Sequence, residues 1–318
     1  MNSSPHNTVV ISVAGLTKRF GDLVAVNDLN LEIFQGEVFG FLGPNGAGKS
    51  TSINMICGLL RPDAGEVRIN GKPAAKEIRL RNRFGLCPQE VIVWPRLTCL
   101  EQLSFMGEMY DLSARDARQS GIRLLGQLGL AAKTHALAGT LSGGMKRRLN
   151  ICLALVHHPE IVVFDEPEAG LDPQSRIMVR DFIRSLRKNN TVILTTHNMD
   201  EADRLSDRVA IIDNGRLLLT DTPENLKKTA GTGDILEVSL ESSQGKEYAH
   251  ALQLLSESGT DATLHGDCIR VREKNAIEHI PWMTSRLQEA GFSITEIKMR
   301  TNTLEDVFIQ LTGKRLRE

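Results

Sequence analysis

The chain contains 318 residues, a length that corresponds to about two domains of ordinary size. Its 38 Lys and Arg residues nearly balance 39 Asp and Glu residues, and the formal net charge of −1 speaks against a nucleic-acid binder, which needs a basic surplus to displace counterions. No stretch reaches the ~18 consecutive apolar residues of a membrane helix, the first residues lack a signal-peptide pattern, and the cysteines form no C-x-x-C pair. These features predict a cytoplasmic protein with reduced thiols that needs a partner chain for any work at a membrane.

The first strong motif is a glycine-rich segment between a predicted strand and a predicted helix. Residues 37–42 form a short apolar run, and residues 50–60 have apolar side chains at helical spacing until Arg61 and Pro62 end the pattern. The segment between them fits G-x-x-x-x-G-K-[ST], in which backbone N–H groups surround phosphates, lysine reaches their outer oxygens and the hydroxyl binds Mg²⁺. An ordinary glycine-rich turn is the alternative, but a helix N-terminus favours a bound anion. The predicted phosphate-binding loop consists of Gly43, Pro44, Asn45, Gly46, Ala47, Gly48, Lys49, Ser50 and Thr51.

Residues from about 95 to 155 predict a mostly helical region. A capping box at Thr98 precedes one apolar-periodic segment, and a second periodic segment follows it. Near the end of the region, Ser142 can cap a helix that begins with Gly143 and Gly144. The N-terminus of this helix and the serine hydroxyl are therefore expected to face an anion.

Two later apolar runs, at residues 161–164 and 191–196, predict strands that end in polar residues. Asp165 and Glu166 follow the first run, and His197 follows the second. Ligands bind at the carboxyl ends of strands in open parallel sheets. These side chains and the lysine of the phosphate-binding loop are therefore predicted to converge.

The order of these segments resembles the nucleotide-binding subunit of ATP-binding cassette (ABC) transporters, from about residue 9 to about residue 226. Leu141-Ser142-Gly143-Gly144-Met145 is similar to the signature motif of that family, which few other phosphate-loop proteins carry. The resemblance implies ATP and Mg²⁺ as ligands and ATP hydrolysis as the activity. It assigns adenine stacking to Phe20 and ATP binding to residues 43–51, and it assigns contacts with the ATP of a second subunit to Ser142, Gly143 and Gly144. Mg²⁺ binding is assigned to Ser50, Gln89 and Asp165. Catalytic roles are assigned to Glu166, His197 and Gln89.

Four of the assigned side chains also have a purely structural alternative. His197 would be a core histidine, Gln89 an ordinary loop amide and Glu166 a solvated turn carboxylate. Phe20 would belong to the apolar core.

The fold implied by the resemblance is an α/β phosphate-loop NTPase. It has a RecA-like parallel sheet, an N-terminal antiparallel β part and a helical subdomain at about residues 95–155, all within an ATPase domain at residues 1–230. A small α/β domain at residues 231–318 follows a Gly/Thr-rich linker, and we expect it to serve regulation or dimer stability. Its predicted strands lie at residues 235–240 and 268–271, and its predicted helices at residues 249–257 and 277–290.

Two details resemble the export branch of the family, which includes antibiotic-resistance and lipid exporters. Met145 replaces the usual glutamine of the signature, and residues 302–309 are similar to the C-terminal sequence of that branch. The resemblance implies an ATPase that powers export through a separate transmembrane permease, at the inner face of the cell membrane, with no nucleic-acid partner. Two cassettes, identical or different, would enclose ATP between them. The alternative is a soluble ABC-type ATPase that acts on a macromolecular complex, while a simple phosphate-loop kinase would leave the signature unexplained.

Two further residues carry hypotheses of their own. Trp94, within the apolar residues 91–95, either docks the membrane partner or covers the core of the helical region. Glu168 stands where most of the family has threonine, and it either points to solvent or adds negative charge beside Glu166.

Overall fold

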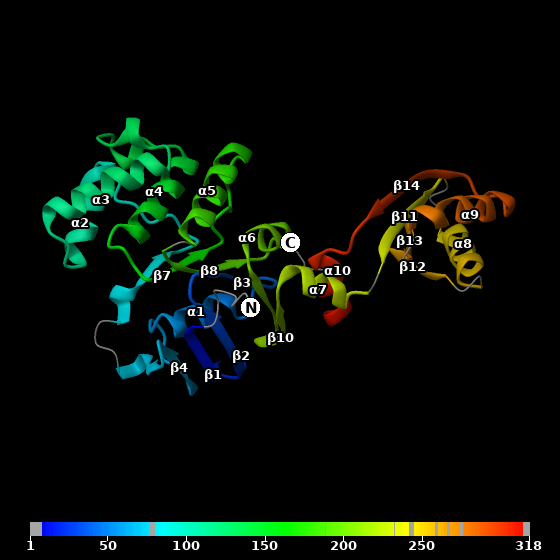
Figure 1. The fold of residues 1–318 in the computed structure, drawn as a ribbon, viewed down its shortest axis with the longest axis horizontal. Coiled ribbons are helices and arrows are strands. Elements are labelled where there is room, and N and C mark those ends of the chain that lie inside the picture. The colour runs from blue at the N-terminus through cyan, green and yellow to red at the C-terminus, as the bar shows by residue number, and fades with distance from the viewer. Residues whose placement is uncertain are drawn as a thin grey trace, which may run out of the picture. The chain divides into compact units, whose positions relative to one another are not determined.

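The computed structural model describes residues 8–76, 80–187, 189–231, 233–241, 245–257, 260–265, 268–273 and 276–313. Within these residues the chain forms two compact units that divide between Pro223 and Glu224 (Figure 1). The sequence placed this boundary at residue 230. Asn302 Nδ2 donates to the carbonyl oxygen of Gly231 at 2.8 Å, and this bond holds the linker to the second unit. The signal-peptide prediction rests on the first seven residues, which lie outside the described residues. The linker prediction rests in part on Thr232, which lies outside them as well.

A mostly parallel sheet forms the centre of the first unit. Its strands are β3 (Val38–Leu42), β6 (Phe84–Cys87), β7 (Ile161–Asp165), β8 (Thr191–Thr196), β9 (Arg208–Asp213) and β10 (Arg216–Asp221). The strand order is β10-β9-β3-β8-β7-β6, with parallel pairing from β9 to β6 and an antiparallel edge at β10. Every residue of β3 is buried, as expected for a parallel strand that is covered on both faces. The predicted parallel core is confirmed.

An antiparallel sheet, drawn in blue in Figure 1, covers one side of this core. Its strands are β1 (Val9–Phe20), β2 (Leu23–Phe34), β4 (Ala64–Ile69) and β5 (Lys72–Pro73), in the order β2-β1-β4-β5. Ile11 and Ile33 of this sheet share a buried cluster with Phe39 and Phe41 of β3 and with Ile53 of helix α1 (Lys49–Ile56). Alternate residues of the same central strands face the opposite side. The antiparallel part expected at the N-terminus is therefore confirmed.

Helix α1 is shorter than predicted. The sequence pattern suggested a helix to residue 60, but α1 ends at Ile56 because Gly58 takes a left-handed conformation, with φ of +69°. The following backbone N–H groups of Leu59 and Leu60 both turn back to the carbonyl oxygen of Asn54. Such a turn satisfies the free carbonyl groups at a helix end.

The other face of the central sheet packs on helices. These are α2 (Cys99–Met109), α3 (Ala114–Gln127), α4 (Gly143–Leu155), α5 (Pro173–Leu186) and α6 (Met199–Leu205), with 3₁₀ turns η1 (Ala74–Lys76), η2 (Leu80–Arg83), η3 (Ala131–Lys133) and η4 (Ala138–Thr140) elsewhere in the unit. The capping box predicted at Thr98 is present, since its hydroxyl accepts from Glu101 N at 3.2 Å and the Glu101 carboxylate accepts from Thr98 N at 2.8 Å. The predicted helical subdomain is confirmed. None of the helices in the described ranges has both the length and the apolar composition to cross a membrane.

The second unit has β-α-β-β-α-β topology, which is typical of ferredoxin-like folds. After α7 (Pro223–Thr229), its elements are β11 (Asp234–Leu240), α8 (Gly245–Glu257), β12 (Asp261–His265), β13 (Cys268–Glu273), α9 (Ala276–Glu289), β14 (Ile294–Arg300) and a closing α10 (Leu304–Thr312). The strands pair antiparallel in the order β12-β13-β11-β14, and α8 and α9 share one apolar core with them. The sequence pattern did not predict β12 and β14, because their apolar residues do not alternate clearly.

We expect Gly85→Ala to destabilise the first unit. A Cβ atom at Gly85 of β6 would lie 2.0 Å from the carbonyl oxygen of Ala154 in α4 and 2.8 Å from Cγ of Pro159. The helix would have to move away from the strand, and the free energy of unfolding should fall by ~1 to 3 kcal/mol in urea denaturation. Gly126→Ala in α3 is the matched control, since no atom lies within 4 Å of its added Cβ. Equal stability of the two variants would contradict the close strand–helix packing.

Candidate functional site

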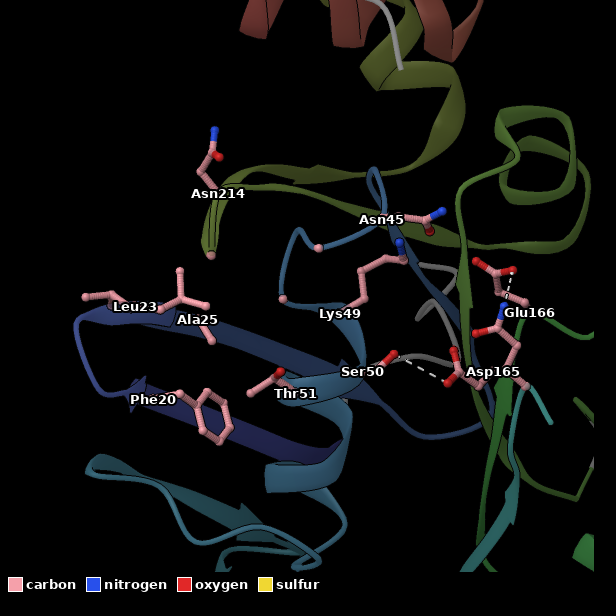
Figure 2. A pocket seen from close by; sticks show the side chains of 15 residues that line it. Phe20, Leu23, Ala25, Asn45, Lys49, Ser50, Thr51, Asp165, Glu166 and Asn214 are labelled. Carbon is pink, nitrogen blue, oxygen red and sulfur yellow. Dashed lines mark hydrogen bonds between the residues drawn. The ribbon is translucent and has the colours of Figure 1, made fainter. Parts of the chain in front are cut away.

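A pocket of about 600 Å³ runs along the edge of the central sheet where β3, β7 and β8 end. Figure 2 shows Phe20 and Leu23 at one end of the pocket, and Asp165 and Glu166 at the other. Lys49 lies between them. The pocket is lined by Phe20, Leu23, Val24, Ala25, Asn45, Gly46, Gly48, Lys49, Ser50, Thr51, Gln89, Asp165, Glu166, Asn214 and Gly215.

The glycine-rich loop at residues 43–48 connects β3 to the N-terminus of α1, and its backbone approaches its neighbours too closely for side chains. A Cβ at Gly43 would lie 2.2 Å from the carbonyl oxygen of Ile212, and one at Gly48 would lie 2.4 Å from that of Ala25. Gly48 also has φ of +99°, which side-chain-bearing residues rarely adopt. The loop therefore presents backbone N–H groups and a helix N-terminus to the pocket, an arrangement that favours a bound anion.

Lys49 is the cation of the pocket. Its ammonium group donates to the carbonyl oxygens of Gly43 at 2.7 Å and Pro44 at 3.0 Å, and the residue is almost fully buried. Burial lowers the pKa of Lys49, while the negative charges of Glu166 and Asp165 act in the opposite direction. A buried positive charge next to an anion-binding loop is suited to phosphate.

Asp165, at the end of β7, provides oxygen atoms near the start of α1. Its Oδ1 accepts from the hydroxyl of Thr195, and its Oδ2 accepts from Ser50 Oγ at 3.4 Å. A carboxylate and a hydroxyl beside a phosphate-binding loop are a hard-oxygen donor set of the kind that Mg²⁺ prefers. The remaining Mg²⁺ ligands in such sites are phosphate oxygens and water.

The carboxylate of Glu166 contacts side chains from two other segments of the chain. Its Oε1 lies 2.6 Å from Nδ1 of His197, and its Oε2 accepts from Nε2 of Gln89 at 3.2 Å. The backbone of Glu166 has φ of +50°, a conformation that is uncommon for a residue with a side chain, and its N–H donates to the carbonyl oxygen of Thr195 at 3.0 Å. The structure thus brings Gln89, Glu166 and His197 together, and it buries Glu166.

Phe20 and the signature residues lie away from these carboxylates. Phe20 is 50% exposed at the far end of the pocket, with Lys18 Nζ at 5.6 Å from its ring centroid, so it is not a core residue. Ser142 caps α4 by accepting from Met145 N at 3.3 Å, as predicted. Ser142 and Gly143 are exposed, and neither they nor Gly144 are among the described residues that line the pocket.

Of the two expectations for Glu168, the one that places it in solvent is wrong. The side chain does not point to solvent, because the residue is only 6% exposed. Its two carboxylate oxygens accept from Nε and Nη2 of Arg180 in α5, at 2.8 and 2.7 Å, and Arg176 Nε lies 3.8 Å away. The charge of Glu168 is therefore matched by an arginine that the local sequence gave no reason to pair with it.

Two buried charged residues near the pocket had no role predicted from the sequence: Arg147 in α4 and Glu201 in α6. Arg147 contacts the backbone of the segments that carry Gln89, Asp165 and Glu166. Each of them stands among other charged residues of its helix, such as Arg148 in α4 and Asp200 in α6, so the sequence neither singles them out nor identifies their partners.

Glu201 lies behind the loop that carries His197. Its Oε2 accepts from the hydroxyl of Thr196 at 2.5 Å, and that hydroxyl in turn accepts from Asn198 N at 2.9 Å. Burial raises the pKa of Glu201 from 4.5 to about 7, and the negative charges of Glu168 and Glu166 add to the effect of burial. The backbone N–H of Glu168 and the hydroxyl of Thr196 act against this rise.

We expect Glu201→Gln to change the pH dependence of stability. The unfolded carboxyl loses its proton near pH 4.5 and the folded one near pH 7, so the contribution of Glu201 to stability is largest below pH 4.5 and is lost as the pH rises to 7. The neutral variant removes this loss and should exceed the wild type at pH 8 by as much as ~3 kcal/mol. Denaturation between pH 4.5 and 8 measures the difference. Glu66→Gln, at an exposed ion pair, should leave the curve unchanged, and a pH-independent difference for Glu201→Gln would contradict the assignment.

Known proteins similar to this chain support a specific family. The model of the ABC transporter family matches residues 26–169. The linearmycin resistance ATP-binding protein LnrL of Bacillus subtilis (strain 168) is 35% identical over 314 residues, which cover 97% of this chain and 100% of LnrL. Nod factor export ATP-binding protein I of Burkholderia orbicola (strain AU 1054) is 36% identical over 310 residues, covering 97% of this chain and 98% of that protein.

A solved structure has a similar fold over about two thirds of the chain. It is the dimeric structure of a post-hydrolysis state of the ATP-binding cassette MJ0796 bound to ADP and Pi, with a TM-score of 0.61 and 26% identity. The match covers 67% of this chain and 98% of that one. Both relatives above, in contrast, extend over nearly the whole of this chain, including the second unit.

Proposed function

This chain belongs to the ABC transporter family as an ATP-binding subunit, an ATPase that powers transport, and we propose that it binds ATP in the pocket of Figure 2 and drives export through a separate membrane-spanning partner. The observation that carries the proposal is the convergence, in one pocket, of a phosphate-binding loop with a carboxylate that is held by a histidine and a glutamine. The names of the two relatives, one in linearmycin resistance and one in Nod factor export, favour an exporter over a soluble ATPase that acts on a macromolecular complex.

The shape of the pocket supports one orientation of ATP. The exposed ring of Phe20 would stack on adenine. The backbone N–H groups within residues 43–51, which Pro44 lacks, would hold the phosphates together with the ammonium of Lys49. Ser50 and Asp165, with Gln89, would hold Mg²⁺, which when bound neutralises phosphate charge and orients the phosphate oxygens. The γ-phosphate would then face Glu166 and His197.

Hydrolysis in this arrangement depends on Glu166. The water oxygen forms a bond to the γ-phosphorus while the bond from that phosphorus to the β–γ bridging oxygen breaks, and Glu166 accepts the proton that the water loses. His197 and Gln89 hold one carboxylate oxygen each, which supports a fixed orientation of Glu166 toward the water. The products are ADP and inorganic phosphate.

The exposed signature supports a head-to-tail dimer. Ser142, Gly143 and Gly144 form the N-terminus of α4, outside the pocket of their own chain, where they can bind the phosphates in the pocket of a second cassette. The similar cassette MJ0796 forms a dimeric structure, which favours a dimer for this chain as well. Contact with the membrane-spanning partner would hold the dimer at the inner face of the membrane.

We expect Glu166→Gln to remove turnover and preserve ATP binding. The amide has the shape of the carboxylate but cannot accept the proton, so the ATPase rate should fall ~10² to 10⁴-fold. The variant should also accumulate as an ATP-bound dimer in size-exclusion chromatography. Glu160→Gln, at a largely exposed carboxylate, is the control and should retain the wild-type rate. A rate within twofold of the wild type for Glu166→Gln would exclude Glu166 as the base.

We expect Trp94→Ala to uncouple transport from ATP hydrolysis. Trp94 is 37% exposed and packs edge-on against Phe105, and Val91 and Ile92 beside it are also exposed, which supports an apolar docking surface close to Gln89. Loss of a central aromatic anchor should weaken binding of the membrane partner ~10-fold or more. Transport in vesicles that contain the partner should fall while the ATPase activity of the isolated chain persists. Ile177→Ala, at an exposed residue of α5, is the control, and unchanged transport for Trp94→Ala would favour the alternative that Trp94 covers the helical region.

A further inference from the structure

Arg147 is a buried cation that is bound by backbone groups. The residue is 2% exposed, and each of the five N–H groups of its guanidinium has a carbonyl acceptor within the described residues. The acceptors are the carbonyl oxygens of Pro88 (2.5 Å) and Gln89 (3.0 Å) for Nη1, Asp165 (2.7 Å) and Glu166 (2.8 Å) for Nη2, and Pro167 (3.3 Å) for Nε.

These carbonyl groups belong to the two segments that supply the pocket with its glutamine and its carboxylates. Residues 88–89 follow β6, and residues 165–167 are the last residue of β7 and the two residues after it. The planar guanidinium of Arg147 is therefore hydrogen-bonded to both segments. These bonds limit how far the backbones of Gln89 and Glu166 can move apart. Since their side chains are hydrogen-bonded to each other at 3.2 Å, a shift of either backbone segment would disturb the position of the Glu166 carboxylate.

Arg147 also connects these segments to the exposed end of α4. The helix begins directly after its cap, Ser142, and Arg147 lies about one and a half turns further along the same helix. A displacement or reorientation of the helix N-terminus is therefore carried to the guanidinium through a short, continuous helical segment. The guanidinium in turn contacts the backbone of the residues that hold Glu166.

We propose that Arg147 is a positioning residue that couples the signature end of α4 to the Gln89–Glu166 pair of the same chain. Nucleotide that is held in the pocket of a second cassette and bound against this signature thereby promotes hydrolysis in the pocket of the chain that carries the signature. The inference rests on the proposed function, because the nucleotide at the signature belongs to a second cassette. Arg147 touches no reacting atom in this account. Its effect is on the orientation of Glu166 and on the cooperativity between the two pockets of a dimer.

The test compares Arg147→Lys with Arg147→Gln. Lysine keeps the charge but has three N–H donors, and glutamine has two, so neither can bind all the carbonyl groups. We expect both variants to bind ATP with a dissociation constant within threefold of the wild type, measured by fluorescence of a labelled nucleotide. Their kcat should fall at least tenfold, and the Hill coefficient for ATP should approach 1. Lysine should retain more activity than glutamine.

Arg208→Lys is the matched control. Arg208 also donates to a backbone carbonyl, that of Glu32 at 3.0 Å, but it lies at the start of β9 and so at the opposite edge of the sheet. This variant should lose stability in urea without loss of kcat or of the Hill coefficient. A kcat within twofold of the wild type for both Arg147 variants, or an equal loss in Arg208→Lys, would overturn the coupling role. A wild-type chain that binds ATP without hydrolysing it would overturn the proposed function as well, which separates the two failures.

Discussion

The parallel pairing of β3, β8 and β7 is the constraint on which the functional pocket depends. β8 lies between the other two strands, and its register sets Leu42 opposite Thr196 and Asp165 opposite Thr195. Because parallel strands end at the same edge, this register brings the phosphate-binding loop, the carboxylates after β7 and His197 to one line, although they are far apart in the sequence. The apolar clusters on both faces hold the strands in this register, since a shift of one residue would disrupt the close packing of the side chains in both clusters.

The charges at this edge are compensated in different ways. Lys49 is held by carbonyl oxygens of its own loop, whereas Glu168 forms a two-point ion pair with Arg180. Glu201 forms no ion pair within the part of the chain that the structure describes, and burial raises its pKa to about 7. Arg147 is satisfied by carbonyl groups alone, which leaves the carboxylates near it free to act on ligands. A pocket that must bind a polyanion thus retains its own carboxylates without a large unbalanced charge.

The second unit is stabilised by its own apolar core and by ion pairs. Its sheet packs α8 and α9 on one face, while α10 is tied to strand residues by ion pairs. Asp306 of α10 accepts from Nη1 of Arg300 at 2.6 Å and from Nη2 at 3.0 Å. Burial acts to raise the pKa of Asp306, but Arg300 and Thr303 outweigh it and lower the pKa to about 2. The carboxylate therefore stays charged, and the pair persists, across the physiological pH range.

The sequence by itself determined the features that depend on local chemistry. The phosphate-binding loop, the caps at Thr98 and Ser142, the buried parallel strands and the polar residues at their ends all follow from short patterns, because glycine geometry, capping and apolar periodicity act over a few residues. Only the tertiary structure decided which partners the charged residues have. The pairing of Glu168 with Arg180, the five carbonyl acceptors of Arg147 in the described structure and the burial of Glu201 involve segments that meet after folding, so no local pattern could predict them.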